Sequence, residues 1–219
     1  MYSEVSDPFA KALNGVRPEH QEVFRKFAKE LRGHRADELC ERIIQMLQEP
    51  HRSWTEKNGI LYFSVVSLAV DGPSWIEYLK HSRVRLGDSG KDVLRSRGFH
   101  FVKGLVTEVA VIRGSLYGDA ERTVERIRAD AAVRNLQQPN ADVACLIRKK
   151  FTDADIRAMG LWSILTMHNP IRNAHEAPCL LVAGCTEPGN WIDALSDHGG
   201  LLNPNFGFAF AKSQVIIEP

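Results

Sequence analysis

The segment 206–217 places the strongest constraint on the fold of this chain. Phenylalanine occupies every second position from Phe206 to Phe210, and glycine or alanine occupies the positions between them. Because side chains alternate between the two faces of a β-strand, this order predicts a strand with one bulky face and one small face. The small face suits close packing against a helix or another backbone. We therefore expect a fold that combines strands with helices.

Three further segments are predicted to be strands. Residues 59–70 are almost entirely apolar and lie between two turn sequences, NG and DGP. Their β-branched and aromatic side chains favour a strand buried on both faces, although periodicity alone also allows a buried helix. Residues 105–112 and 178–184 have a similar apolar character. Phe99 and Phe101 show a period of two, which also indicates a strand.

Helical periodicity, capping residues and proline starts predict the helices. Residues 17–50 have the pattern of a helical hairpin. The segment 156–167 is apolar around most of its circumference, so we expect it to form a central buried helix. The segment 191–195, WIDAL, is predicted to be a helix between two strands, which gives a strand–helix–strand unit with a parallel pair. Four more helices are predicted over 73–82, 88–96, 119–135 and 139–150.

These elements predict an α+β fold. We expect one helix-rich domain over residues 1–219, with a small, mostly buried mixed sheet. The N-terminal helical hairpin is either part of this domain or a subdomain of its own. No apolar run reaches the roughly 18 residues of a membrane span. The first residues lack the basic start and apolar stretch of a signal peptide. We therefore expect a soluble cytoplasmic protein whose four cysteines are free thiols.

Charge is distributed unevenly along the chain. The net charge is +1, but residues 80–113 carry eight basic and three acidic side chains, whereas residues 174–219 carry one and five. Cations interleaved with aromatic side chains are typical of surfaces that bind phosphate backbones. We therefore predict a binding protein for an anionic partner, either nucleic acid or an acidic protein. The predicted binding residues are Arg83, Arg85, Arg95, Arg97, Phe99, Phe101 and Lys103. The alternative is a solvated face that pairs with the acidic C-terminal segment.

A second hypothesis is an enzyme, a hydrolase or transferase that uses Cys185 as its nucleophile with His168 or His198. Cys185 follows a predicted strand and precedes a predicted helix, whose N-terminus would stabilise a thiolate. The surrounding sequence argues against this hypothesis. Nucleophile elbows have glycine two positions before and after the nucleophile, where this chain has Ala183 and Glu187. The carboxylate of Glu187 would also raise the pKa of the thiol.

A third hypothesis is a structural or assembly subunit. The small face of 207–211 and the apolar segment 156–167 would then form an oligomer interface instead of an interior. Each hypothesis predicts a different observable: anion binding, thiol reactivity or self-association.

No metal and no cofactor is predicted. Two cysteines and three histidines lie within 31 residues, but an extended 179–185 segment would separate its two sulfurs by about 20 Å. The segment 86–92, LGDSGKD, ends like a phosphate-binding loop. However, Arg85 stands in place of the first glycine of that motif, and Asp92 replaces the hydroxyl side chain that would hold Mg²⁺.

Overall fold

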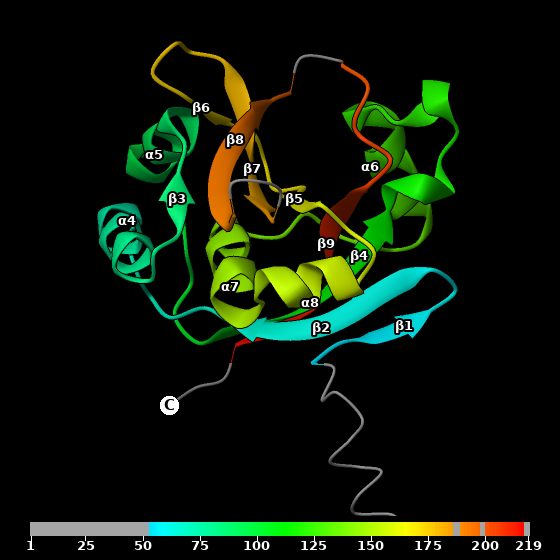
Figure 1. Ribbon diagram of the computed structural model, residues 1–219, viewed down its shortest axis with the longest axis horizontal. Helices are drawn as coiled ribbons and strands as arrows, with labels where there is room; N and C mark the ends of the chain where they lie inside the picture. Colours follow the sequence, from blue (N-terminus) through cyan, green and yellow to red (C-terminus); the bar gives the residue numbers. More distant parts are fainter. Residues whose placement is uncertain (1–52, 186–188, 198–199, 217–219) are drawn as a thin grey trace, which may run out of the picture. The chain divides into compact units, whose positions relative to one another are not determined.

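The computed structural model describes residues 53–185, 189–197 and 200–216, and residues 53–219 form one compact unit (Figure 1). The strands are β1 (Thr55–Lys57), β2 (Ile60–Val66), β3 (Arg85–Leu86), β4 (Leu105–Arg113), β5 (Ser163–Thr166), β6 (Ile171–Arg172), β7 (Pro178–Gly184), β8 (Trp191–Ser196) and β9 (Phe206–Ile216). The helices are α4 (Gly72–His81), α5 (Asp88–Arg95), α6 (Val124–Val133), α7 (Asp142–Lys150) and α8 (Asp153–Ala158). The predicted hairpin over 17–50 lies outside the described residues.

The prediction of a helix-rich domain with a small sheet is wrong. In the described part of the chain, nine strands form one mixed sheet, and strands and helices hold similar numbers of residues. The sheet order is β1-β2-β4-β9-β5-β7-β8-β3, and β6 pairs with β7 beside this path. The prediction overestimated helix because two strands in the second half of the chain have sequences that resemble buried helices.

The sheet is mixed because it contains both antiparallel and parallel strand pairs, and β9 takes part in one of each kind. It pairs antiparallel with β4 and parallel with β5. β7 runs antiparallel to both β5 and β8, and the two-residue β3 pairs parallel with β8 at the edge. The predicted strand–helix–strand unit is therefore wrong. β7 and β8 are antiparallel neighbours, and β5 lies between β7 and β9.

Adjacent residues on the central strands pack into two different hydrophobic clusters. Val111 and Leu181 belong to the cluster that contains residues of α4, α5, α7 and α8. Their neighbours Ile112 and Leu180 belong to the cluster that contains residues of α6. Because side chains alternate across a strand, the sheet is covered by helices on both faces. Helix α6 stands apart from the other helices in Figure 1.

The predicted alternation of β9 is confirmed. Phe208 and Phe210 are buried in the α6 cluster, whereas Ala209 is buried in the cluster on the opposite face. A Cβ atom at Gly207 would lie 2.5 Å from Val111 Cγ1 and 2.7 Å from a methyl group of Leu161. The small face therefore packs inside the domain, and it is not available as the oligomer surface of the third hypothesis.

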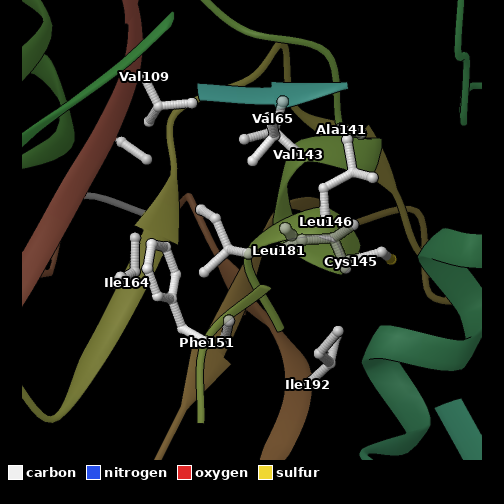
Figure 2. Close-up of a cluster of buried hydrophobic side chains, with 14 of the residues drawn as sticks. Val65, Val109, Ala141, Val143, Cys145, Leu146, Phe151, Ile164, Leu181 and Ile192 are labelled. Atoms are coloured by element: carbon white, nitrogen blue, oxygen red, sulfur yellow. The ribbon is translucent and has the colours of Figure 1, made fainter. Parts of the chain in front are cut away.

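The core beneath α7 brings helix and sheet side chains into contact (Figure 2). Figure 2 shows Leu146 of α7 and Phe151 close to Leu181 of β7. Phe151 also meets Phe63 of β2 edge to face, with ring centroids 4.7 Å apart. Such aromatic pairs add about 0.5–1.5 kcal/mol to the stabilisation from buried area. Segments distant in the sequence thus share one continuous core.

The predicted central helix over 156–167 is wrong. Helix α8 ends at Ala158, and Gly160 has a φ of +73°, a left-handed conformation that ends a helix. Residues Ser163–Thr166 then form β5, which is paired on both sides and buried at every position. A strand covered on both faces loses the polar–apolar alternation that identifies strands in a sequence. None of the described helices is long and apolar enough to cross a membrane.

Three other local predictions also differ from the structure. WIDAL forms strand β8 instead of a helix, and Phe99 and Phe101 lie in a loop. The helix expected over 119–135 is broken into a 3-10 turn and α6, because Thr123 caps α6 by accepting a hydrogen bond from the backbone N–H of Arg126. The interruption leaves Arg122 buried.

Most of the other predicted elements are confirmed. The segments expected over 73–82, 88–96 and 139–150 form α4, α5 and α7, with shorter bounds for α7. The strands expected over 59–70, 105–112 and 178–184 form β2, β4 and β7. However, β2 is buried on one face only, because Ser64 and Val66 are exposed.

The close approach of α4 to α5 gives a test of the packing. A Cβ atom at Gly72 would lie 1.6 Å from the carbonyl oxygen of Leu94. We expect Gly72→Ala to lower the free energy of unfolding by about 3 kcal/mol, since overpacking forces the backbone apart. Urea denaturation measures this change. Gly200→Ala is the control, because no atom lies within 4 Å of its added Cβ. Equal losses in both variants would contradict the described packing.

Candidate functional site

Five of the eight cations in residues 80–113 are exposed and form no ion pair with any carboxylate in the described part of the chain. We call them the basic surface: Arg83, Arg85, Arg95, Arg97 and Lys103. The other three are paired. Lys80 Nζ lies 2.8 Å from Glu77, Lys91 Nζ lies 2.8 Å from Asp88, and Arg113 lies 2.7 Å from Glu56. The five cations of the basic surface are the five cations of the predicted binding site.

The end of α4 and strand β3 position Arg83 and Arg85. Arg83 has a φ of +58°, and its backbone N–H donates to the carbonyl of Lys80 at 2.9 Å, which ends the helix in a tight turn. The next residue, Val84, is buried in the core. Arg85 begins the edge strand β3, whose outer side has no described strand partner. Because Val84 lies between the two arginines and is buried, it holds both of them at the surface.

Helix α5 positions Arg95, and the loop after it holds Arg97. Val93 and Leu94 are completely buried, which leaves Arg95 on the solvent side of the helix. Gly90 allows α5 to approach β8, since a Cβ atom there would lie 2.9 Å from the Cα of Asp193. The Gly90 N–H also donates to the Asp193 carboxylate at 3.0 Å. The α5–β8 contact therefore fixes the orientation of the helix that presents Arg95.

The predicted aromatic members of the site pack into the protein. Phe99 is 8% exposed and belongs to the main core, and Phe101 packs against the same core. The Phe99 ring is therefore closed to base stacking, whereas Phe101 is only half-buried. Tyr78 on α4 is 40% exposed, but the ammonium group of Lys149 lies 5.3 Å from the centre of its ring.

A shallow pocket of about 420 Å³ adjoins Arg95 at the hairpin between β6 and β7. Its charged lining residues are two arginines and two acids: Asp92, Arg95, Arg172 and Glu176. Arg172 lies 3.9 Å from Glu176, so the positive charge in this pocket is largely balanced. The pocket therefore adds no net positive charge to the basic surface.

The acidic C-terminal segment does not pair with the basic surface in the described residues. Asp193 accepts hydrogen bonds from the backbone N–H groups of Gly90 and Ala194. Asp197 lies 3.9 Å from Arg128, a residue of α6. The described carboxylates of this segment thus have other partners, and the cations of the basic surface face solvent.

Cys185 follows β7 and is buried. Its thiol donates to the carbonyl of Leu161 at 3.6 Å, and its own carbonyl accepts a hydrogen bond from Arg157 at 3.1 Å. Burial raises the pKa of the Cys185 thiol, and the positive charges of Arg157 and Arg148 only partly oppose that effect. The next described element is strand β8, so a helix N-terminus is not available there to stabilise a thiolate.

His168 lies far from Cys185 and has backbone partners on both ring nitrogens. Its Nε2 accepts a hydrogen bond from the Leu181 N–H at 2.9 Å, and its Nδ1 donates to the carbonyl of Asn169 at 2.6 Å. Leu181 lies on β7 four residues before Cys185, which directly follows that strand, so the two are roughly 13 Å apart by strand rise. The structure therefore does not bring Cys185 and His168 together. His198 lies outside the described residues.

The other sulfur and imidazole groups considered as metal ligands are also dispersed. Cys179 is buried and its thiol donates to the carbonyl of Ala177 at 3.4 Å, while His175 is exposed in the hairpin. Within the described ranges, no three side chains of His, Cys, Asp or Glu lie close enough to hold a metal ion.

A scan against protein-family models found no match, and searches of the curated proteins and of the solved structures found none either.

The sequence patterns did not point to the second cationic region of the domain, at the C-terminal end of α7. Arg148, Lys149 and Lys150 are consecutive there, and all three line a pocket next to α4. The available signal was this run of three basic residues before Phe151. Basic residues are common in the last turn of a helix, so the run alone did not separate a site from ordinary helix chemistry.

The burial of His168 predicts a stability change in mild acid. Burial lowers the pKa of His168 from 6.5 to about 4, with a smaller contribution from Arg128. The unfolded chain therefore takes up a proton below about pH 6.5 that the folded protein does not bind until about pH 4. We expect this group to remove about 3 kcal/mol of stability over that interval. Urea titrations at several pH values measure it.

His168→Gln is the control variant for this pH dependence. A glutamine oxygen replaces Nε2 as an acceptor for the Leu181 N–H without titrating. Its stability should change less between pH 6.5 and pH 4. Identical pH profiles for both proteins would show that His168 is not the responsible group.

The environment of Cys185 predicts low thiol reactivity. We expect iodoacetamide to modify Cys185 at neutral pH more slowly than a free cysteine, because the thiol is buried and its pKa is raised. Peptide mapping by mass spectrometry after timed alkylation measures the rate at this position alone. Modification in urea supplies the rate for the same thiol when exposed. A native rate above that value would support the nucleophile hypothesis.

Proposed function

We propose that this protein is a cytoplasmic binding protein whose basic surface binds a polyanion, with single-stranded nucleic acid as the ligand to test. The observation that supports the proposal most directly is the exposure of five cations with no described carboxylate paired to them. Exposed cations attract phosphate groups through the local field, whatever the net charge of the chain.

Two of the three acids on α4 and α5 are neutralised by lysines, and the third, Asp92, offsets one positive charge beside Arg95. Glu77 and Asp88 are each bonded to a lysine three residues away, at 2.8 Å. The Asp193 carboxylate accepts two backbone hydrogen bonds. The lysines thus neutralise the neighbouring acids and leave the arginines available to a ligand.

The positions of the cations favour an extended ligand. Arg85 precedes α5, and Arg95 ends it. A helix of 8 residues is about 12 Å long, so the two arginines occupy positions that successive phosphates of one strand can contact together. A chain of phosphates spans this distance, which is why we propose a polyanion for this surface.

The burial of Phe99 and Phe101 defines the expected mode of binding. Base stacking on Phe99 is excluded in the described conformation because its ring is buried, and Phe101 is half-buried against the same core. Affinity would therefore come from phosphate contacts, which depend steeply on salt and carry little sequence information. We expect weak discrimination between bases.

A triple substitution tests the proposal. We expect Arg95→Ala, Arg97→Ala and Lys103→Ala together to weaken binding of a single-stranded oligonucleotide. The slope of log affinity against log salt concentration should fall by about 2, since each lost phosphate contact on a single strand contributes about 0.7. Fluorescence anisotropy at several salt concentrations measures both quantities.

The matched control removes three charges elsewhere. Lys57 lies on β1 at the far edge of the sheet, Arg126 lies on α6 on the opposite face from α5, and Arg134 is the residue that follows α6. Alanine at these three positions should leave the salt dependence nearly unchanged. Equal effects of the two triple variants would reject the basic surface as the binding site. No binding by the natural protein at low salt would reject the proposed function itself.

A further inference from the structure

A pocket of about 420 Å³ lies between the C-terminal ends of α4 and α7. Residues of α4, the turn before β3, the end of α7 and the start of α8 form its wall. Its volume is within the usual range for small-molecule sites, roughly 300–1,000 Å³. None of its lining residues belongs to the basic surface defined above.

The charged lining of this pocket is mainly cationic. Arg148, Lys149 and Lys150 line it together with one acid, Asp153. Arg148 and Asp153 neutralise each other through a contact of 2.9 Å. The two lysines form no ion pair with a carboxylate in the described part of the chain, so they leave an excess of two positive charges.

Aromatic rings position the two lysine ammonium groups. Lys149 Nζ lies 5.3 Å from the centre of the Tyr78 ring, and Lys150 Nζ lies 5.7 Å from that of Phe151. Tyr78 is itself held edge to face against the buried Trp75, at 5.5 Å. Cation–π contacts restrain an ammonium group and leave its N–H donors free for a ligand.

Arg148 makes this wall of the pocket rigid. It is 5% exposed, and its guanidinium donates to the carbonyls of Gly184 and Phe151 as well as to Asp153. Its Nε is buried and has no hydrogen-bond partner. Burial lowers the pKa of Arg148, so its charged form is incompletely compensated by the protein. A further anion nearby would reduce that deficit.

We propose that the pocket between α4 and α7 binds a phosphate group, carried by a small phosphorylated molecule or by the end of a nucleic acid strand. A phosphate monoester carries close to two negative charges at neutral pH, which match the excess of two in the lining. A carboxylate carries only one. The pocket is a separate site from the basic surface, so this proposal does not depend on the proposed function.

The test uses the full chain and isothermal titration calorimetry with inorganic pyrophosphate at low salt. We expect saturable binding in the natural protein. Lys149→Gln combined with Lys150→Gln should weaken it roughly tenfold or more, since two charge-assisted hydrogen bonds are lost. Lys57→Gln, a charge removed from the far edge of the sheet, should leave the affinity unchanged.

A second variant distinguishes a loss of binding from a loss of folding. Ala154 lines the pocket, is exposed, and is the second residue of α8. Glutamate near a helix N-terminus is favourable for folding, so Ala154→Glu should keep the native circular dichroism spectrum. It places a negative charge in the pocket and should abolish pyrophosphate binding.

The two sources of phosphate are separated with oligonucleotides of one sequence that carry a 5′-phosphate or a 5′-hydroxyl. Tighter binding of the phosphorylated strand, lost in Ala154→Glu, assigns the pocket to a strand end. Pyrophosphate binding without that preference assigns it to a small phosphorylated molecule. The inference is wrong if the natural protein does not bind pyrophosphate and binds the two oligonucleotides equally tightly. It is also wrong if both pocket variants bind pyrophosphate and the phosphorylated strand as tightly as the natural protein does. Binding of the 5′-hydroxyl strand reports on the basic surface alone, so failure at the two sites is distinguishable.

Discussion

Strand β9 is the element on which the rest of the domain depends, because it joins the two halves of the sheet. It pairs antiparallel with β4 and parallel with β5, so β1, β2 and β4 are connected to β5, β7, β8 and β3 only through it in the described topology. Its side chains also set the distance to the layers on either side. Gly207 admits Val111 and Leu161 at close range, and Phe208 and Phe210 fill the space beneath α6. Large and small side chains must therefore alternate here.

Arg148 performs a related role at one end of the sheet. It connects the last turn of α7 to the carbonyl of Gly184 at the end of β7, and to Asp153 at the start of α8. Burying a guanidinium is costly unless its hydrogen bonds are nearly complete. The same bonds hold the segment 148–153 against the sheet, and this segment forms one wall of the pocket beside α4. One side chain therefore both closes this end of the sheet and fixes a wall of the pocket.

The edge of the sheet explains why positive charge gathers where it does. β3 is a two-residue edge strand with no described strand on its outer side, and α5 ends near the hairpin between β6 and β7 with Arg95 exposed. Arginines at these positions remain in water, while Lys80 and Lys91 are close enough to acids on their own helices to pair with them. An uncovered edge with arginines also resists pairing with other strands, a recognised protection for edge strands.

Local patterns of apolar spacing, turn residues and proline in the sequence located β9, β4, β7, α4, α5 and α7. The sequence also located the five cations of the basic surface, since charge can be counted along a chain. It did not identify β5 and β8. β5 is buried at every position between β7 and β9, so it lacks a polar face, and the partners of both strands come from distant segments. Only the tertiary structure decided that Phe99 is buried and Phe101 half-buried, that Cys185 and His168 are apart, and that Lys149 and Lys150 face a pocket with Tyr78. Burial and proximity depend on which remote segments pack together, and residue order within one segment does not contain that information.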